Sequence, residues 1–97
     1  MATYSEALSK HATLTATTVD TVTLTGTDYY SVEVVHRSGS LTTPIYFTVD
    51  GSTPTVEGDD TYVVMPGGWK TVKSRVNVDV IKLISAGAVA YSVTGEG

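Results

Sequence analysis

A strand that ends in a sharply defined turn is the densest local signal in this sequence, and it lies at residues 44–55 (PIYFTVDGSTPT). Ile45, Phe47 and Val49 fall on one face at a spacing of two, and β-branched and aromatic residues dominate the segment. Asp50-Gly51 then ends the strand, because an aspartate can bond its own backbone and a glycine tolerates a positive φ. The stretch carries no reactive group, so it predicts a structural unit rather than a catalytic one.

The same alternation of apolar and polar residues recurs along the chain between turns that contain Gly, Ser, Asp or Pro. Every second residue from Tyr30 to His36 is expected on the apolar side of a strand. Residues 78–85 carry apolar side chains on both faces, as a strand covered on both sides does. About eight short strands are expected, two within residues 11–25 and one each at 30–37, 45–49, 61–65, 69–76, 78–85 and 88–94. This pattern predicts an all-β, antiparallel β-sandwich, with a small barrel as the structural alternative.

The 97 residues are enough for one domain with its own core, and no composition break divides them, so we expect a single domain over residues 1–97. Residues 1–10 are polar and weakly patterned. They predict a short N-terminal arm, or at most one helical turn around Glu6–Leu8, that becomes ordered on a partner. The sequence shows neither an apolar leader nor a segment of membrane-spanning length, so we expect a soluble protein without a membrane partner.

Charge and composition argue against several classes of function. The formal net charge is −4 with only six Lys and Arg, and nucleic-acid affinity depends on basic residues, so no nucleic-acid partner is expected. The absence of cysteine excludes a disulfide framework and a thiolate metal site, and it suits assembly in a reducing cytoplasm. Six tyrosines against one phenylalanine favour half-buried aromatic positions at sheet surfaces and protein contacts.

The sequence offers little that points to catalysis. Ser38, His36 and an aspartate form a nucleophilic triad only on paper, since nothing here resembles a nucleophile elbow. His36 ends an alternating strand on its apolar side, which favours a hydrogen-bonded histidine at the boundary of the core over a base or a ligand. His11 precedes the first expected strand and has no readable partner. We therefore assign no catalytic residue and expect a protein that is not an enzyme.

Four acidic residues, Asp50, Glu57, Asp59 and Asp60, lie in or near turns, and hard cations are bound by several carboxylate and carbonyl oxygens. Their spacing matches no EF-hand pattern. Solvated turn acids, with Asp50 capping its own turn, are the favoured interpretation, and a calcium site is a minor alternative. We expect no resident metal or cofactor.

Trp69 follows a Gly-Gly turn and, if the alternation holds, points away from Val72 and towards Lys73 and Arg75. One interpretation is an aromatic platform for the face of a sugar or for a groove on a protein, because tryptophan is enriched at contact hot spots. The other is packing at a sheet corner, with lysine stems over the ring. The sequence favours the two about equally.

Residues 45–55 resemble the Tyr-Thr-x-Asp-Gly-Ser-x-Pro-Thr signature of the small β-sandwich module at the carboxyl end of chitobiases and in many bacterial surface proteins. The resemblance covers about a dozen residues and is specific for a strand and its turn. It implies an immunoglobulin-like fold and an accessory role, and it brings no catalytic residue with it.

A wider resemblance, of arrangement rather than of a chemical motif, covers most of the chain. The segments that carry it are residues 22–26, 32–37, 45–55, 58–63, 65–68 and 80–85. With these segments the chain is similar to small virion proteins of tailed bacteriophages, in particular capsid decoration or minor head proteins. The resemblance implies a β-sandwich on the capsid surface of the virion, assembled in the host cytoplasm, that binds the major capsid protein lattice and stabilises it, often as a trimer or in many copies.

We expect the arm and the sheet edge beside it to face the capsid, with contacts from exposed aromatic and apolar residues. The expected contact residues are Tyr4, Leu8, Tyr29, Tyr46 and Trp69. A rival hypothesis is a carbohydrate-binding accessory domain, on a phage tail or a bacterial surface, that uses Trp69 and nearby tyrosines. A weaker rival is a tail-tube or head–tail joining protein, which would assemble into rings.

Overall fold

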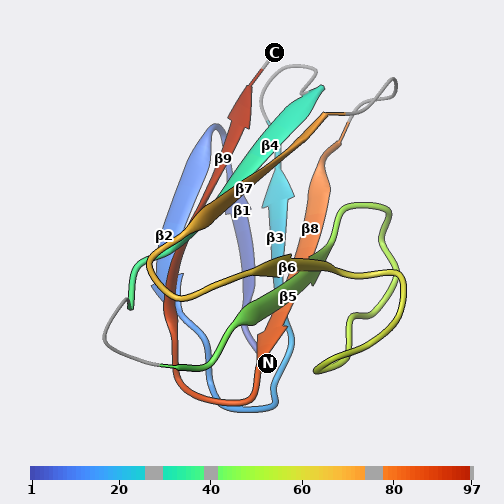
Figure 1. Cartoon of the computed structure of the whole chain (residues 1–97). Helices are drawn as coiled ribbons and strands as arrows, with labels where there is room; N and C mark the ends of the chain where they lie inside the picture. The colour runs from blue at the N-terminus through green and yellow to red at the C-terminus, as the bar shows by residue number, and fades with distance from the viewer. Residues whose placement is uncertain (26–29, 39–41, 74–77, 97) are drawn as a thin grey trace.

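The computed structural model describes residues 1–25, 30–38, 42–73 and 78–96, and within them the chain forms two β-sheets packed face to face (Figure 1). Where about eight strands were expected, the described residues form nine. In chain order they are β1 (Thr3–Glu6), β2 (Ser9–Thr13), β3 (Asp20–Leu24), β4 (Ser31–His36), β5 (Ile45–Thr48), β6 (Tyr62–Val64), β7 (Trp69–Lys73), β8 (Val80–Ser85) and β9 (Ala90–Glu96). In this described part of the chain, no helix is long and apolar enough to cross a membrane.

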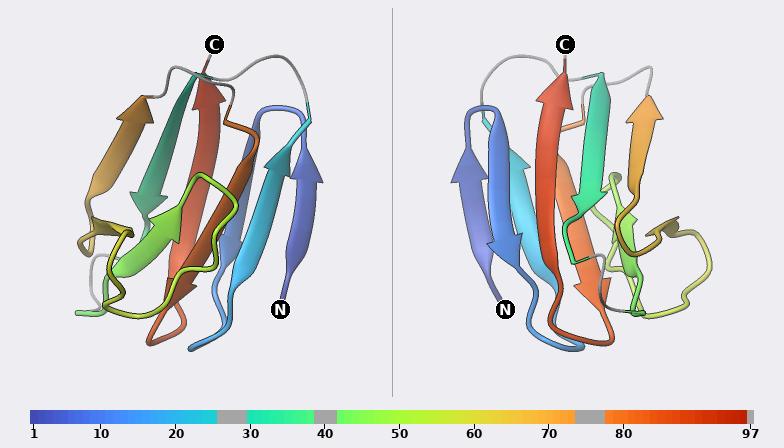
Figure 2. Two further views of the ribbon diagram at one scale, coloured as in Figure 1. Left: turned by 90° about the vertical axis from the view of Figure 1, so that its right-hand side faces the viewer. Right: turned by 60° about the vertical axis from the view of Figure 1, so that its left-hand side comes forward.

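The two layers interleave distant parts of the sequence (Figure 2). One sheet has the strand order β1-β3-β8-β5-β6, and we call it sheet A; the other has the order β2-β9-β4-β7, and we call it sheet B. All strand pairs are antiparallel except β1 with β3, which is parallel. The predicted all-β, two-layer architecture is confirmed, and the parallel pair is an addition that the sequence did not suggest.

The core lies between the sheets and is built from the inward positions that alternation predicts. In β3 and β4 every second residue is buried, as expected from the period-two pattern. The prediction was wrong for Tyr30, which is 44% exposed, because it precedes β4 and lies outside the strand. The apolar core comprises Leu14, Val22, Leu24, Val32, Val34, Ile45, Phe47, Val64, Val72, Val78, Ile81, Leu83, Val89, Tyr91 and Val93.

Residues 1–10 do not form an arm or a helical turn. Thr3–Glu6 runs parallel to β3 in sheet A, and Ser9–Thr13 runs antiparallel to β9 in sheet B, so this segment belongs to both layers. The chain crosses between the sheets at Ala7-Leu8. Neither strand contains a fully buried residue, which explains why hydrophobic periodicity gave no sign of them.

Residues 44–55, which carry the strongest local pattern in the sequence, form β5 and the turn after it. Ile45 and Phe47 are fully buried, as predicted. Asp50 caps its own turn, because one of its oxygens accepts bonds from the backbone N–H (3.0 Å) and the hydroxyl (2.6 Å) of Ser52. These bonds to Ser52 lower the pKa of the Asp50 carboxyl. Gly51 has a φ of +85°, the conformation that its position after the aspartate predicted.

The remaining strands differ from the expectations mainly at their ends. β8 lies in the middle of sheet A and buries residues on both of its faces, as its continuous apolar composition predicted. β6 is shorter than residues 61–65, and β9 extends beyond 88–94 to Glu96. The predicted end of the 69–76 strand and the turns at 26–28 and 39–40 lie outside the described residues.

Candidate functional site

The predicted contact residues lie on separate surfaces of the sandwich. Tyr4 and Leu8 are at the edge where β1 and β2 meet, and Trp69 is on β7 at the opposite edge, where sheet A ends in β6 and sheet B ends in β7. Tyr46 is on β5, one strand in from that opposite edge. Tyr29 lies outside the described residues. The five residues therefore do not form one site.

The β1–β2 edge is closed by polar side chains. The Lys10 ammonium lies 4.2 Å from the centre of the Tyr4 ring and 3.6 Å from a Glu6 carboxylate oxygen, so one cation bridges the two strands. Tyr4 is half-buried and packs against the core, whereas Leu8 is 55% exposed at the crossing. The expected contact role of Tyr4 is weakened, because lysine already covers its ring.

The β6–β7 edge exposes three large apolar side chains to solvent. Val63 and Met65 are 47% and 60% exposed, and Trp69 is 69% exposed. Tyr62, at 39% exposed, instead points inward against Phe47, with ring centres 5.3 Å apart. Apolar side chains that gather on one surface can mark a contact site, and those of this edge are divided between the outer face of sheet A (Val63) and the outer face of sheet B (Trp69).

The outer face of sheet A carries a row of apolar residues next to this edge. Tyr46 is directly opposite Val63 on β6 and Ile84 on β8, and these three side chains share the outer face because their neighbours Ile45 and Val64 point into the core. Ile84 is 8% exposed, and Tyr46 is half-buried. With the exposed Met65 that follows β6, we call Tyr46, Val63, Met65 and Ile84 the β5–β6 face.

The β5–β6 face stands out against the rest of the outer surface of sheet A. A row of polar side chains crosses this surface from β1 through β3 and β8 to β5. It consists of Thr3, Thr21, Lys82 and Thr48. Tyr46 was predicted from the sequence, but Val63 and Met65 were missed. A Tyr-Val-Val-Met run is compatible with a buried strand, and only the position of β6 at the end of sheet A leaves it uncovered.

Trp69 lies on the outer face of sheet B, opposite Val35 of β4. It points away from the buried Val72, as predicted. Lys70 lies 5.8 Å from the Tyr62 ring centre, and Arg75, one of the two cations expected beside Trp69, lies outside the described residues. A ring that is 69% exposed is not packed into a sheet corner, so the structure favours the interpretation as an exposed platform.

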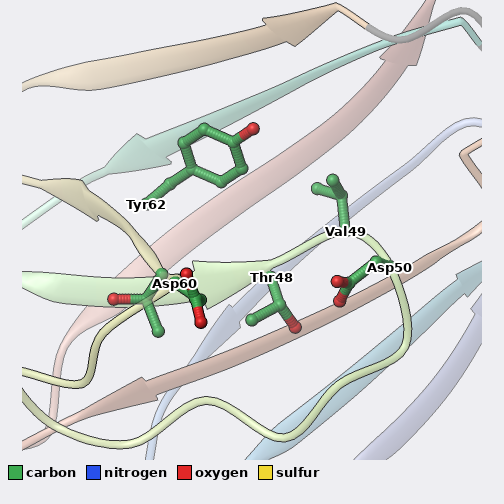
Figure 3. Close-up of a pocket in the computed structure, with 6 residues that line it drawn as sticks. Thr48, Val49, Asp50, Asp60 and Tyr62 are labelled. Atoms are coloured by element: carbon green, nitrogen blue, oxygen red, sulfur yellow. The ribbon is translucent and has the colours of Figure 1, made fainter.

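An open pocket of about 390 Å³ lies between the end of β5 and the start of β6 (Figure 3). Tyr62 lies to one side of the β5 ribbon in this view, and Asp60 and Thr48 lie to the other. The six lining residues are Thr48, Val49, Asp50, Asp60, Thr61 and Tyr62. Of the four acids weighed as a calcium site, Asp50 and Asp60 line this pocket and Glu57 and Asp59 do not. Within the described ranges, no three His, Cys, Asp or Glu side chains gather as metal ligands.

The structure does not bring Ser38 and His36 together as members of a nucleophilic triad. His36 is buried, and its Nε2 lies 2.8 Å from the carbonyl oxygen of Thr43, while its Nδ1 accepts the backbone N–H of Ser38 at 3.1 Å. The Ser38 hydroxyl oxygen accepts the backbone N–H of Ala90 instead. The hydrogen-bonded histidine is confirmed, inside the core rather than at its boundary. His11, for which the sequence indicated no partner, has its Nδ1 2.6 Å from the Ser92 hydroxyl oxygen.

A buried pair of polar side chains, which was not predicted from the sequence, joins the two sheets. The Tyr91 hydroxyl of β9 donates to Asp20 of β3 at 2.9 Å, and the second Asp20 oxygen accepts the backbone N–H of Ala2 at 3.3 Å. Burial, and then the nearby Asp20 carboxylate, raise the pKa of Tyr91 well above its ordinary value. Asp20 is in phase with the inward-facing Val22 and Leu24, but an aspartate at such a position is more typical of a break between strands than of a core.

Comparison with known proteins adds information about the fold alone. No family model matches the chain, and no curated protein matches its sequence. A de novo designed double-stranded β-helix has a TM-score of 0.57 at 13% identity, with 91% of this chain and 97% of that one covered. PliG from Aeromonas hydrophila, a periplasmic inhibitor of g-type lysozyme, has a TM-score of 0.57 at 16% identity, with 98% and 96% covered. The chain therefore shares its β architecture with these proteins.

Proposed function

We propose that this chain is a non-enzymatic structural protein of a tailed-bacteriophage virion that binds the assembled capsid surface and stabilises it. The observation that carries the proposal is the β5–β6 face, where Val63 and Met65 expose apolar surface beside Tyr46 on an outer sheet face that is elsewhere mainly polar. The resemblance to phage head proteins of residues 22–26, 32–37, 45–55, 58–63, 65–68 and 80–85 supports the identity of the partner, the major capsid protein lattice.

We propose a jelly-roll fold in place of the immunoglobulin-like sandwich that the sequence resemblance implied. Numbered from β2 to β9, sheet B holds the first, eighth, third and sixth strands and sheet A holds the second, seventh, fourth and fifth, with β1 added beside β3. This is the strand order of a jelly roll, a fold used by viral capsid proteins, and the similarity to a double-stranded β-helix supports it. The resemblance of residues 45–55 then reflects a shared strand and turn, not a shared topology.

The surface that faces the capsid also differs from the original expectation. Residues 3–6 and 9–13 are strands of the two sheets, so deleting residues 1–10 would remove β1 and part of β2 and would test folding rather than binding. The β5–β6 face is the better assignment, because Val63 and Met65 on it are exposed and a partner could bury them. Many copies on a symmetric lattice would add small contacts of this kind into a large stabilisation.

The test is binding of purified protein to heads of the phage that encodes it, measured by co-sedimentation. Replacing Val63 and Met65 by Asp places charges on the β5–β6 face, and we expect at least about a tenfold loss of affinity. Thr13→Asp on the exposed face of β2 is the matched control and should bind as the parent does. Thermal melts confirm that each variant is folded. Unchanged binding of the doubly charged variant would reject this face as the capsid contact.

A second candidate function is carbohydrate binding, and the 69% exposure of Trp69 on the outer face of sheet B favours it. Stacking on a sugar needs an aromatic ring, so Trp69→Ala should abolish binding to bacterial surface polysaccharide while Trp69→Phe retains part of it. Isothermal titration with the purified polysaccharide measures both. Equal binding by Trp69→Ala would remove this candidate, and rings in negative-stain micrographs would instead favour the tail-tube or head–tail joining role.

A further inference from the structure

The outer edge of sheet B is a strand with one side unpaired. β7 pairs with β4 in the register Ser31↔Lys73 to Val35↔Trp69, and it is the last strand of its sheet. Along β7 only Val72 is buried, and the other four side chains are exposed. Within the described residues no strand pairs with the second side of β7. An unpaired edge of this length offers a row of backbone donors and acceptors to another strand.

The hydrogen bonds to β4 determine which backbone groups face outward. The N–H of His36 donates to the carbonyl oxygen of Gly68 at 2.9 Å, and the two residues are opposite each other in the register of β4 with β7. In an antiparallel pair such residues alternate, so the backbone groups of Lys70 and Val72 also point to β4. The N–H and C=O groups of the intervening residues, Trp69, Thr71 and Lys73, therefore point away from the sheet.

The sequence of β7, Trp-Lys-Thr-Val-Lys, complements itself when it is read antiparallel about its central residue. With Thr71 opposite Thr71 of a second copy, Trp69 lies opposite Lys73 of that copy. These are the outward-pointing residues, so each such pair can exchange two backbone hydrogen bonds. On the outer face the register brings a lysine beside a tryptophan ring at both ends and two threonines together in the middle, and pairs of both kinds stabilise sheets.

We propose that two copies of this chain associate through their β7 strands, antiparallel and about a two-fold axis at Thr71, so that sheet B continues from one copy into the other. Charge placement identifies a second copy as the occupant. Lysines on an edge strand usually discourage pairing, but in this register Lys73 lies opposite Trp69 and Lys70 lies opposite Val72 of the second copy. No like charges are opposed.

This dimer goes beyond the proposed function and does not depend on it. The β5–β6 face lies on the outer side of sheet A, in the other layer, and stays exposed when β7 is paired. A dimer would present two such faces to a lattice and raise the effective concentration of the second contact. Loss of the dimer and loss of capsid binding are consequently separate results, produced by different substitutions.

The experiment measures self-association by sedimentation equilibrium at protein concentrations up to about 1 mM, since two five-residue strands form a small interface. Thr71→Pro removes the central outward N–H and spares the bonds to β4, because proline is tolerated where its nitrogen faces away from the neighbouring strand. We expect it to raise the dissociation constant at least about tenfold. Trp69→Lys, which opposes lysine to lysine without changing the backbone, should do the same.

Single cysteines test the register, since the chain has none of its own. Thr71→Cys on β7 should cross-link rapidly between copies with a short bismaleimide, and Thr13→Cys, an exposed threonine on the other edge strand of sheet B, should not. The proposal is overturned by a monomer throughout the concentration range, by a trimer, by a dimer that both Thr71→Pro and Trp69→Lys leave intact, or by equal cross-linking at positions 13 and 71.

Discussion

The sandwich has two edges at which the chain passes from one sheet to the other, and they are built from different side chains. At the β1–β2 edge Lys10 covers Tyr4 and pairs with Glu6, and Ala2 is bonded to the buried Asp20. At the β6–β7 edge Val63, Met65 and Trp69 are left in solvent. The first edge pairs its aromatic and charged side chains within the chain, whereas the second leaves three large apolar side chains exposed to a partner.

The difference separates stability from interaction. Substitutions at the β1–β2 edge should change the free energy of unfolding, because its side chains are bonded to the core. Substitutions at the β6–β7 edge should change binding and leave folding nearly intact, because its exposed side chains are solvated in the monomer. This contrast predicts an order of effects on stability, beginning with the buried anchor of the β1–β2 edge.

The largest effect is expected for Asp20→Ala. The substitution leaves the Tyr91 hydroxyl and the Ala2 N–H without their acceptor, and we expect a loss of about 2–3 kcal/mol in the free energy of unfolding. Urea denaturation followed by circular dichroism measures it. Thr3→Ala, exposed on β1, is the control and should cost less than about 1 kcal/mol. Equal, small losses for both variants would show that Asp20 does not anchor this edge.

The same anchor predicts instability in alkali. The pKa of Tyr91 is raised in the folded state, so the folded protein keeps this proton when the unfolded chain has lost it. The contribution of this raised pKa to the free energy of unfolding is fully present below about pH 10, the ordinary tyrosine pKa. It is lost as the pH rises, by at most about 1.4 kcal/mol per pH unit. Urea midpoints between pH 8 and pH 11 should fall more steeply for the parent than for Tyr91→Phe. Parallel pH curves would contradict the assignment.

The same comparison shows what the sequence could reveal. β3, β4 and β5 were predictable because one face of each is buried, and the turn after β5 because Asp50 and Gly51 have specific backbone roles. β1 was not predictable, since it is a parallel edge strand without a buried residue. The strand order could not be predicted either, because it depends on pairing between strands that are distant in the sequence. The signature at residues 45–55 is local, and it does not encode which distant strands lie beside β5.

The candidate site was predictable in part. Tyr46 and Trp69 were identified by the preference of large aromatic residues for contact surfaces. Val63 and Met65 were not, because apolar residues in a strand indicate burial unless the end of a sheet leaves them uncovered. Asp20 was missed because an aspartate in a strand is read as a break, although its buried partner Tyr91 lies 71 positions away in the sequence.

A smaller effect on stability is expected for Lys10→Ala. Its ammonium is 4.2 Å from the Tyr4 ring centre and 3.6 Å from Glu6, and the two contacts are partly solvent-exposed, so we expect a loss of about 0.5–1 kcal/mol. Lys10→Met retains the stem over Tyr4 and separates packing from charge. Half a molar salt should reduce the difference between parent and Lys10→Met by screening the ion pair. If salt does not change the stability difference between the parent and Lys10→Met, the ion pair does not contribute, and the loss in Lys10→Ala comes from the missing side-chain stem alone.

The smallest effect is expected for Lys70→Ala, the corresponding lysine of the β6–β7 edge. Its ammonium lies 5.8 Å from the Tyr62 ring centre, near the limit at which a cation and a ring attract each other, and its side chain is exposed. We expect a change below about 0.5 kcal/mol in urea denaturation, less than for Lys10→Ala. The pair of alanine variants is a matched comparison, because each removes one lysine from one tyrosine. If Lys70→Ala were the more destabilising, the β6–β7 edge would be internally stabilised like the β1–β2 edge, and its exposed side chains would no longer stand out as a surface left for a partner.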